Sequence, residues 1–158
     1  MASVMDLWQT WSRRPAGTRL FSWVFARRAP YFSTVAPKFV DVRAHRVELV
    51  VPKRRKVLNH IGTVHAIALC NGLEAAMGAL AEVTIPADKR WLPKGMQVSY
   101  TAKADSDVTC VAQTSPEEWA DLPADSGADL PVRVSGRRSD GTVVIEGVIT
   151  LWVSPRKK

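Results

Sequence analysis

Apolar residues near the start of the chain are spaced as on helices. The segments 7–11 and 20–25 each place their large apolar side chains on one helical face, and Pro15 separates them. We expect two short helices there, the second capped at its N-terminus by Thr18. These helices form an N-terminal lead, residues 1–36, that packs on the remaining domain, residues 37–158.

Strict alternation of apolar and polar positions, typical of half-buried strands, follows in several later segments. From residue 39 to 51 the alternation slips its phase near His45, which predicts one strand with a bend or bulge. Pro86 and Pro93 are expected to bracket a loop, and Ser139-Asp140-Gly141 indicates a hairpin turn. Further strands are predicted at 96–105, 108–113, 130–134 and 142–153, joined by hairpin-scale connections, with one helical turn at 116–119.

Between the first strand and the others, the sequence predicts a long helix from about Thr63 to Glu82, with Thr63 as its N-cap. From Ile61 to Ala81 the only formal charge is that of Glu74. A helix this apolar must be covered on most sides, and a single antiparallel sheet wrapped around it would do so. We therefore predict an α+β fold of about five strands with this helix as its filling, and we interpret the helix as a core element and not as a membrane span.

The chain of 158 residues has 46 % apolar and 23 % charged residues, which is normal for one globular domain, but its net charge is +7. The excess is confined to residues 1–56, which hold 12 basic and 3 acidic residues, whereas the remainder holds 10 basic and 12 acidic ones. A nucleic-acid-binding surface is not expected from this distribution. Arginines at helix ends explain it, and a membrane-surface anchor is the alternative that we consider less favoured.

Cys70 and Cys110 lie among apolar residues without the spacing of a metal site or a disulfide framework. We expect buried free thiols in the reducing environment of the cytoplasm. No metal site is predicted.

Glu74 is the first candidate for chemistry. Its neighbours on the helix are Cys70, Asn71, Met77 and Gly78. A carboxylate with few solvating neighbours suits a general base at neutral pH. The alternatives are a narrow solvent-facing stripe or a structural ion pair with an arginine.

Asn59, His60 and His65 gather at the start of the same helix, where unpaired N–H groups could stabilise an oxyanion. His65 and Glu74 are nine residues apart, which is roughly 13 Å along a helix axis, and they face opposite sides. They cannot meet within one chain, so a site that uses both needs two chains. The alternatives are a histidine that packs at a helix start and a loop histidine.

The segment from Asn59 to Ala66, Asn-His-Ile-Gly-Thr-Val-His-Ala, with Glu74 following, resembles the hotdog-fold acyl-CoA thioesterases of the PaaI-like type, in particular a branch with the pattern N-H-x-G-T-x-H-A. The resemblance covers nearly the whole chain in its element order. It implies a helix wrapped by an antiparallel sheet, and a homodimer formed edge to edge or a tetramer made of two dimers. In this superfamily the helix carboxylate of one subunit works with backbone N–H groups at the helix start of the other.

Carried over residue by residue, the resemblance makes Glu74 the general base or nucleophile, and His65 the histidine of the family's His-Gly-Gly pattern. Ala66 and Ile67 replace the two glycines and would supply oxyanion-binding N–H groups, assisted by Asn59, His60 or His65. Gly62 and Thr63 would contact the substrate, and no cofactor is implied. The phosphates of CoA require cations, for which charge alone suggests 53–56, Lys89, Arg90, Arg137 and Arg138.

Three other functions remain open at this point. A non-catalytic acyl-CoA or lipid-binding protein would gain nothing from a carboxylate in an apolar helix. A nucleic-acid-binding protein is suggested by the pI of about 9.9 but is supported by no motif. A hotdog dehydratase would place its histidine and carboxylate differently.

Overall fold

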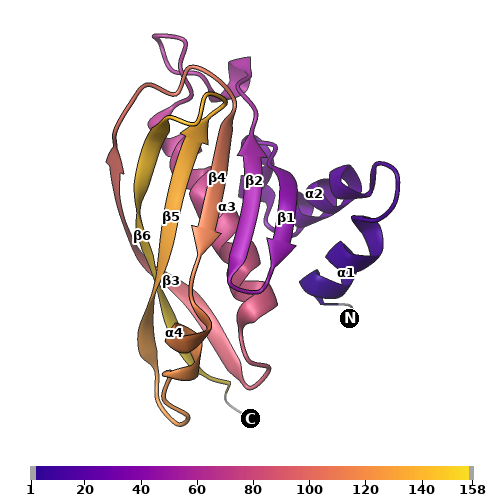
Figure 1. The fold of residues 1–158 in the computed structure, drawn as a ribbon, viewed down its shortest axis with the longest axis vertical. Coiled ribbons are helices and arrows are strands. Elements are labelled where there is room, and N and C mark those ends of the chain that lie inside the picture. The colour runs from indigo at the N-terminus through magenta and orange to yellow at the C-terminus, as the bar shows by residue number, and fades with distance from the viewer. Residues whose placement is uncertain (1–2, 157–158) are drawn as a thin grey trace.

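One antiparallel sheet curves around the central helix α3 (Ala66–Thr84) in the computed structural model, which describes residues 3–156 (Figure 1). The architecture confirms the predicted α+β fold, although the sheet has six strands and not five. In spatial order the strands are β1 (Lys38–Arg43), β2 (Arg46–Val51), β4 (Val108–Gln113), β5 (Ala128–Arg138), β6 (Val143–Pro155) and β3 (Lys89–Tyr100).

The inner face of α3 forms the core with the sheet. Leu73, Met77 and Leu80 are completely buried, and α3 packs mainly on β2 and β4. Gly72 permits this close approach, because a Cβ there would lie 2.4 Å from a methyl group of Val51. By length and composition α3 could cross a membrane, but 61 % of its apolar window is buried inside the fold, as expected for a core helix. Nearby, burial raises the pKa of the Cys110 thiol to about 12.

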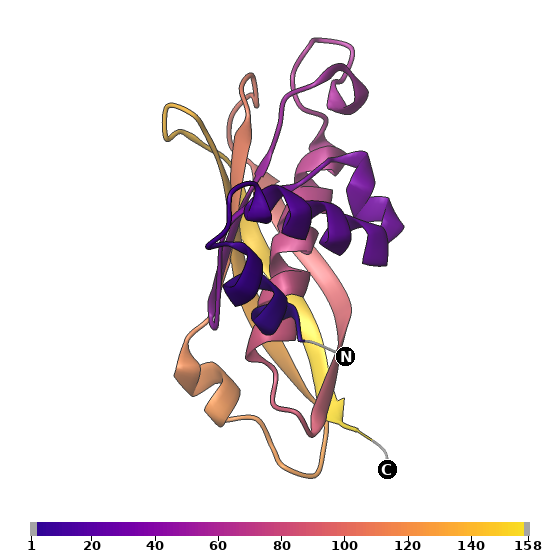
Figure 2. The same ribbon diagram turned by 90° about the vertical axis from the view of Figure 1, so that its right-hand side faces the viewer.

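The N-terminal lead consists of α1 (Val4–Trp11), α2 (Gly17–Arg28) and the 3-10 helix η1 (Pro30–Thr34). It covers β1 and part of the side of α3 that the sheet leaves open (Figure 2). Stacked and edge-to-face rings fix it there: Trp8, Phe21, Phe25, Phe32 and Phe39. Thr18 does not cap α2, because the chain enters the helix through Ala16 in the left-handed conformation.

The phase slip near His45 marks a reversal of the chain and not a bulge. Arg43 pairs with Arg46 across a two-residue turn, and His45 adopts a φ of 66° there. The predicted single strand 39–51 is therefore the hairpin β1–β2, which accounts for the sixth strand. The register irregularity in this hairpin lies between Phe39 and Asp41.

The segment around β3 also differs from the prediction. The strand starts at Lys89, includes Pro93 and ends at Tyr100, so the expected loop is largely strand. Proline is tolerated because β3 is an edge strand. Its chain neighbour β4 pairs with β2 and β5, so the connection 101–107 crosses the end of the sheet and is not a hairpin.

Other predicted elements are confirmed. β5 and β6 form a hairpin, and β6 is an internal strand between β5 and β3. The predicted helical turn is α4 (Pro116–Ala120), which begins with a capping box between Ser115 and Glu118. A short 3-10 helix, η2 (Arg55–Val57), lies in the basic loop before α3.

Candidate functional site

Glu74 lies in the middle of α3 and is only half-buried. Its carboxylate makes no hydrogen bond or ion pair with any other part of the chain that the structure describes. On the adjoining turn, the Cys70 thiol lies 3.3 Å from the hydroxyl of Tyr100 on β3. This hydrogen bond and partial burial raise the pKa of Tyr100 to about 12. Glu74 therefore has a carboxylate available to a ligand beside the free edge of the sheet.

The segment before α3 is a closed turn built by Asn59. Its side-chain oxygen accepts hydrogen bonds from the N–H groups of Ile61 and Thr63, and its amide donates to the Thr63 hydroxyl. Gly62 has a φ of 77°, which favours glycine. The polar groups of Asn59, Gly62 and Thr63 thus maintain the turn, whereas His60 projects from it as an exposed residue.

His65 is the N-cap of α3, in place of the predicted Thr63. Its Nδ1 accepts a hydrogen bond from the N–H of Ile67 at 3.1 Å, while its own N–H donates to the carbonyl of Val57. The N–H of Ile67 is therefore engaged, and of the two predicted oxyanion donors only Ala66 keeps an unbonded N–H within residues 3–156. The side chain of Ile67 is 56 % exposed.

Two pockets adjoin the uncovered face of α3, and Glu74, which lines neither, lies on the helix between a lining residue of each. Asn71, Glu74 and Gly78 follow one another with the spacing i, i+3, i+7 and so share a helical face. The first pocket, of about 220 Å³, includes Asn71, His65 and Lys56. The second, also about 210 Å³, includes Gly78 and is bounded by the N-terminal lead.

Asn71 was not predicted as a site residue, and its environment is unusual. It is 5 % exposed, and its amide N–H group donates to the Thr34 hydroxyl and the Tyr31 carbonyl of η1. Its side-chain oxygen has no partner among the described residues. The sequence signal was available, since an asparagine lies in an otherwise apolar helix, but its partners in η1 are some forty residues away in the chain.

The predicted phosphate-binding cations have different surroundings in the structure. Lys89 is buried and donates to the carbonyls of Pro123 and Ala124, so it fixes a loop. Arg138 is held by Asp105 and Asp140 beside the β5–β6 turn, and these bonds raise its pKa further above the usual value.

The other two arginines are also distant from the helix start. Arg137 lies on the outer face of the sheet with Arg133 and Glu146. Arg90 is exposed at the opposite end of β3 from Tyr100 and bonds to Ser154. None of these four residues meets Glu74 or His65.

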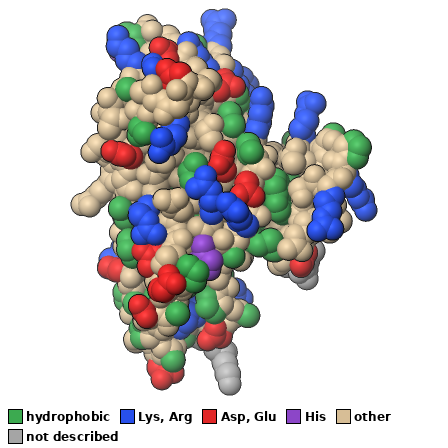
Figure 3. Space-filling model, in the orientation of Figure 1, with side chains coloured by type: hydrophobic (Ala, Val, Ile, Leu, Met, Phe, Trp, Pro, Cys, Tyr) green, Lys and Arg blue, Asp and Glu red, His purple; other side chains and the backbone are tan. Residues whose placement is uncertain are grey.

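In the basic segment 53–56, Lys56 lines the first pocket. Lys53 contacts Asp105 and Asp107, and Arg54 donates to the Thr34 carbonyl at 2.7 Å. Elsewhere, Figure 3 shows Lys and Arg side chains over the α1–α2 lobe and a mixture of both signs on the outer face of the sheet. A continuous basic surface is not seen on this side.

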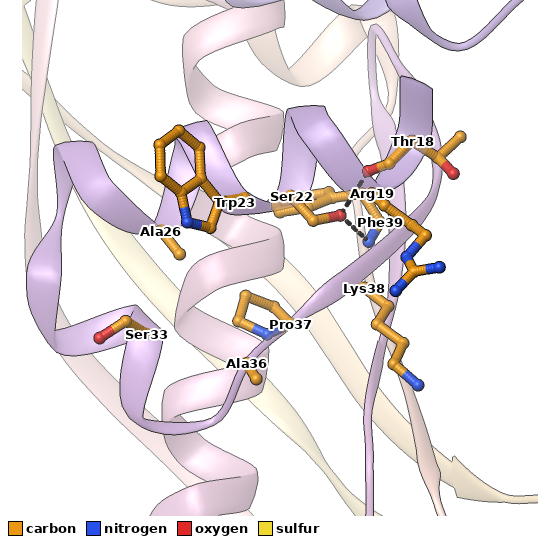
Figure 4. Close-up of a pocket in the computed structure, with 10 residues that line it drawn as sticks. All are labelled: Thr18, Arg19, Ser22, Trp23, Ala26, Ser33, Ala36, Pro37, Lys38 and Phe39. Atoms are coloured by element: carbon orange, nitrogen blue, oxygen red, sulfur yellow. Dashed lines mark hydrogen bonds between the residues drawn. The ribbon is translucent and has the colours of Figure 1, made fainter. Parts of the chain in front are cut away.

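A cleft of about 700 Å³ lies between α2 and the start of β1 (Figure 4). Ser22 at its base is 7 % exposed and already bonded: its hydroxyl donates to the Thr18 carbonyl and accepts the N–H of Phe39. None of the predicted site residues lines this cleft, so we place the candidate site on α3.

The curved sheet, the central helix and the carboxylate on its uncovered face define a hotdog-fold protein. The chain belongs to the family described as "Domain of unknown function (DUF4442)", whose model matches residues 17–153. No curated protein matches it.

Solved structures share the fold. The crystal structure of one structural-genomics target is 42 % identical, with a TM-score of 0.82 over 97 % of this chain and 99 % of that one. A Pseudomonas aeruginosa protein described as a "probable thioesterase" is 20 % identical, with a TM-score of 0.79 over 88 % and 96 %. A thioesterase-family protein from Silicibacter pomeroyi is 19 % identical, with a TM-score of 0.65 over 85 % and 96 %.

Proposed function

We propose that this protein is an acyl-CoA thioesterase whose active sites form between two copies of the chain. The observation that carries the proposal is the unpaired carboxylate of Glu74 on the uncovered face of α3, about one helical turn from a pocket-lining residue on either side, Asn71 and Gly78. The names of the fold relatives add support, because several of them are called thioesterases.

In the proposed reaction, Glu74 removes a proton from water, and the oxygen of that water attacks the thioester carbonyl. The carbonyl oxygen becomes an oxyanion, which accepts a hydrogen bond from the N–H of Ala66 of the partner subunit. When the tetrahedral intermediate collapses, the C–S bond breaks, and the thiolate of CoA takes the proton that Glu74 received from water, which regenerates the carboxylate. The products are a carboxylic acid and free CoA.

Two copies are needed because Ala66 and Glu74 are eight residues apart, about 12 Å along the axis of α3. The edge of the sheet at β3 offers a place for pairing, since the opposite edge at β1 is covered by the N-terminal lead. Tyr100 and Leu92 on β3 are 52 % and 62 % exposed. Backbone pairing of two β3 strands would cover both the open edge and these side chains.

The proposal is tested by thiol release from a panel of acyl-CoA thioesters. We expect Glu74→Gln to lower kcat by about 10²- to 10⁴-fold, the usual contribution of a general base. Glu146→Gln is the matched control, because Glu146 is exposed on the outer face of the sheet, and it should retain the parent rate. Thiol release by Glu74→Gln at the parent rate would exclude the proposed mechanism.

A non-catalytic acyl-CoA-binding protein is the second candidate, since the two pockets support binding as well as hydrolysis. It would be indicated if the parent protein bound acyl-CoA but released no thiol from any member of the panel.

A further inference from the structure

The second pocket beside Glu74 is formed jointly by the N-terminal lead, α3 and β3. Most of its lining is apolar: Val4 from α1, Phe25 from α2, Phe32 from η1, Ala29, Gly78 from α3 and Trp91 from β3. Arg28 and Glu82 complete the lining, and both are exposed residues. The lead thus contributes the walls of a pocket as well as covering α3.

We propose that this pocket holds the hydrocarbon tail of a medium-chain acyl group while its thioester carbon lies at Glu74. The inference rests on the proposed function and adds the class of substrate. Gly78 follows Glu74 by four residues on the same face of α3, so the two positions are about 6 Å apart along the helix axis. A chain bound by its carbonyl at Glu74 reaches the pocket within a few carbon atoms.

The chemistry of the lining favours a plain hydrocarbon. The indole N–H of Trp91 already donates to Glu82 at 3.1 Å. The buried polar atoms that lack partners among the described residues belong to Arg54 and Asn71, and neither residue lines this pocket. The two charged lining residues, Arg28 and Glu82, are exposed, so a hydroxyl or charged group placed against the apolar residues would lose its water without gaining a partner.

The size of the pocket sets the length of the tail. Its volume of about 210 Å³ exceeds the ~150 Å³ of a cavity that accepts benzene, so it has room for roughly six to eight carbon atoms. Gly78 makes this room: a Cβ there would lie 3.6 Å from the Trp91 ring, an ordinary contact, whereas a longer side chain would enter the pocket. Gly78 is accordingly a specificity-determining position.

The first pocket is more mixed in character. Lys56, His65 and Asn71 line it together with apolar residues such as Val57 and Ile67. We therefore assign the hydrocarbon tail to the second pocket.

The test measures binding of S-alkyl-CoA thioethers, which cannot be hydrolysed, with alkyl chains of two to twelve carbons, by isothermal titration calorimetry. In the parent, affinity should rise by up to about fourfold per methylene and level off once the pocket is filled. In Gly78→Leu the affinity should stop rising at an alkyl chain about four carbons shorter than in the parent. The shortest thioethers should bind to this variant as tightly as to the parent. Gly78→Ala is the control and should keep the parent profile.

If Gly78→Leu does not fold, Ala29→Leu replaces it in the experiment, because it reduces the volume of the pocket from the opposite wall. Unchanged length profiles in the folded variants, or no dependence on length in the parent, would overturn the tail pocket. Length-dependent binding without any thiol release would uphold the pocket and reject hydrolysis. Glu74-dependent hydrolysis with unchanged length profiles would reject the pocket alone.

Discussion

Asn59 closes the turn that leads into α3 and thereby sets the position of the helix start. Three hydrogen bonds run from its side chain to residues 61 and 63. The N–H of His65 then bonds to Val57, so the turn, the N-cap and the unbonded N–H of Ala66 form one connected unit. The position of a substrate oxygen bound to the N–H of Ala66 would therefore depend on Asn59, although the substrate would not contact Asn59.

Asn59→Ala should therefore destabilise the protein. Two backbone N–H groups and the Thr63 hydroxyl would lose their partner, which costs about 1–3 kcal/mol. Urea unfolding followed by circular dichroism measures this loss. The control is His60→Ala in the same turn, whose exposed side chain makes no hydrogen bond within residues 3–156 and whose midpoint should equal that of the parent. Equal midpoints for both variants would mean that the turn does not depend on Asn59.

At the scale of elements, β3 and β6 form a long pair whose contact depends on one glycine. A Cβ on Gly147 of β6 would lie 2.0 Å from the carbonyl oxygen of Gln97 on β3. A Cβ on Gly95 of β3, in contrast, would meet no atom within 4 Å, and the φ of Gly95 is not positive. The two glycines therefore serve as a matched pair within one strand pair.

Gly147→Ala should separate β3 locally from β6, because a backbone atom cannot yield as a flexible side chain does. We expect a loss of about 1–3 kcal/mol, as for overpacked interiors, measured by guanidinium unfolding. Gly95→Ala should lie within about 0.5 kcal/mol of the parent, as for ordinary surface changes. A stable Gly147→Ala together with an unstable Gly95→Ala would contradict the described register of β3.

Periodicity predicted most of these elements, because burial on one face imposes a repeat of two or 3.6 residues. It failed where the same pattern has two physical causes. A phase slip indicates either a bulge or a reversal, and the hairpin at His45 was the reversal. Pro93 indicated a loop because alternation does not show that β3 would be an edge strand.

Within the candidate site, a charge in an apolar helix was enough to select Glu74. Charge alone did not show where the cations lie: the bond of Lys89 to a loop and the position of Arg137 on the outer face of the sheet depend on tertiary contacts. The pockets were also beyond prediction, because Phe32, Gly78 and Trp91 come from elements far apart in the sequence.

At the scale of the whole molecule, the charge distribution follows the division of the chain. The N-terminal third carries a charge of +9, from 12 basic and 3 acidic residues, and the remainder carries −2. In that third, Arg13, Arg14, Arg27 and Arg28 end or follow the two helices. Cations near helix C-termini are favoured by the helix dipole. The excess thus has a local explanation that requires no nucleic acid.

The last prediction follows from the proposal that each active site is shared between two chains. Ala66→Pro would remove the unbonded N–H of this residue without disrupting α3, because proline is accepted at the first helical position. His65 before it has a ψ of 140°, which also suits a residue that precedes proline. Glu74→Gln removes the carboxylate from the other half of the site. Each variant alone should be inactive as a homodimer.

When the two variants are unfolded together, mixed in equal amounts and refolded, half of the dimers should contain one chain of each kind. Each mixed dimer has one site with both Glu74 and the N–H of Ala66, so about a quarter of the parent activity should return. The variants refolded separately are the control. If both groups acted within one chain, no mixed dimer would contain an intact site, and the mixture would stay as inactive as its components.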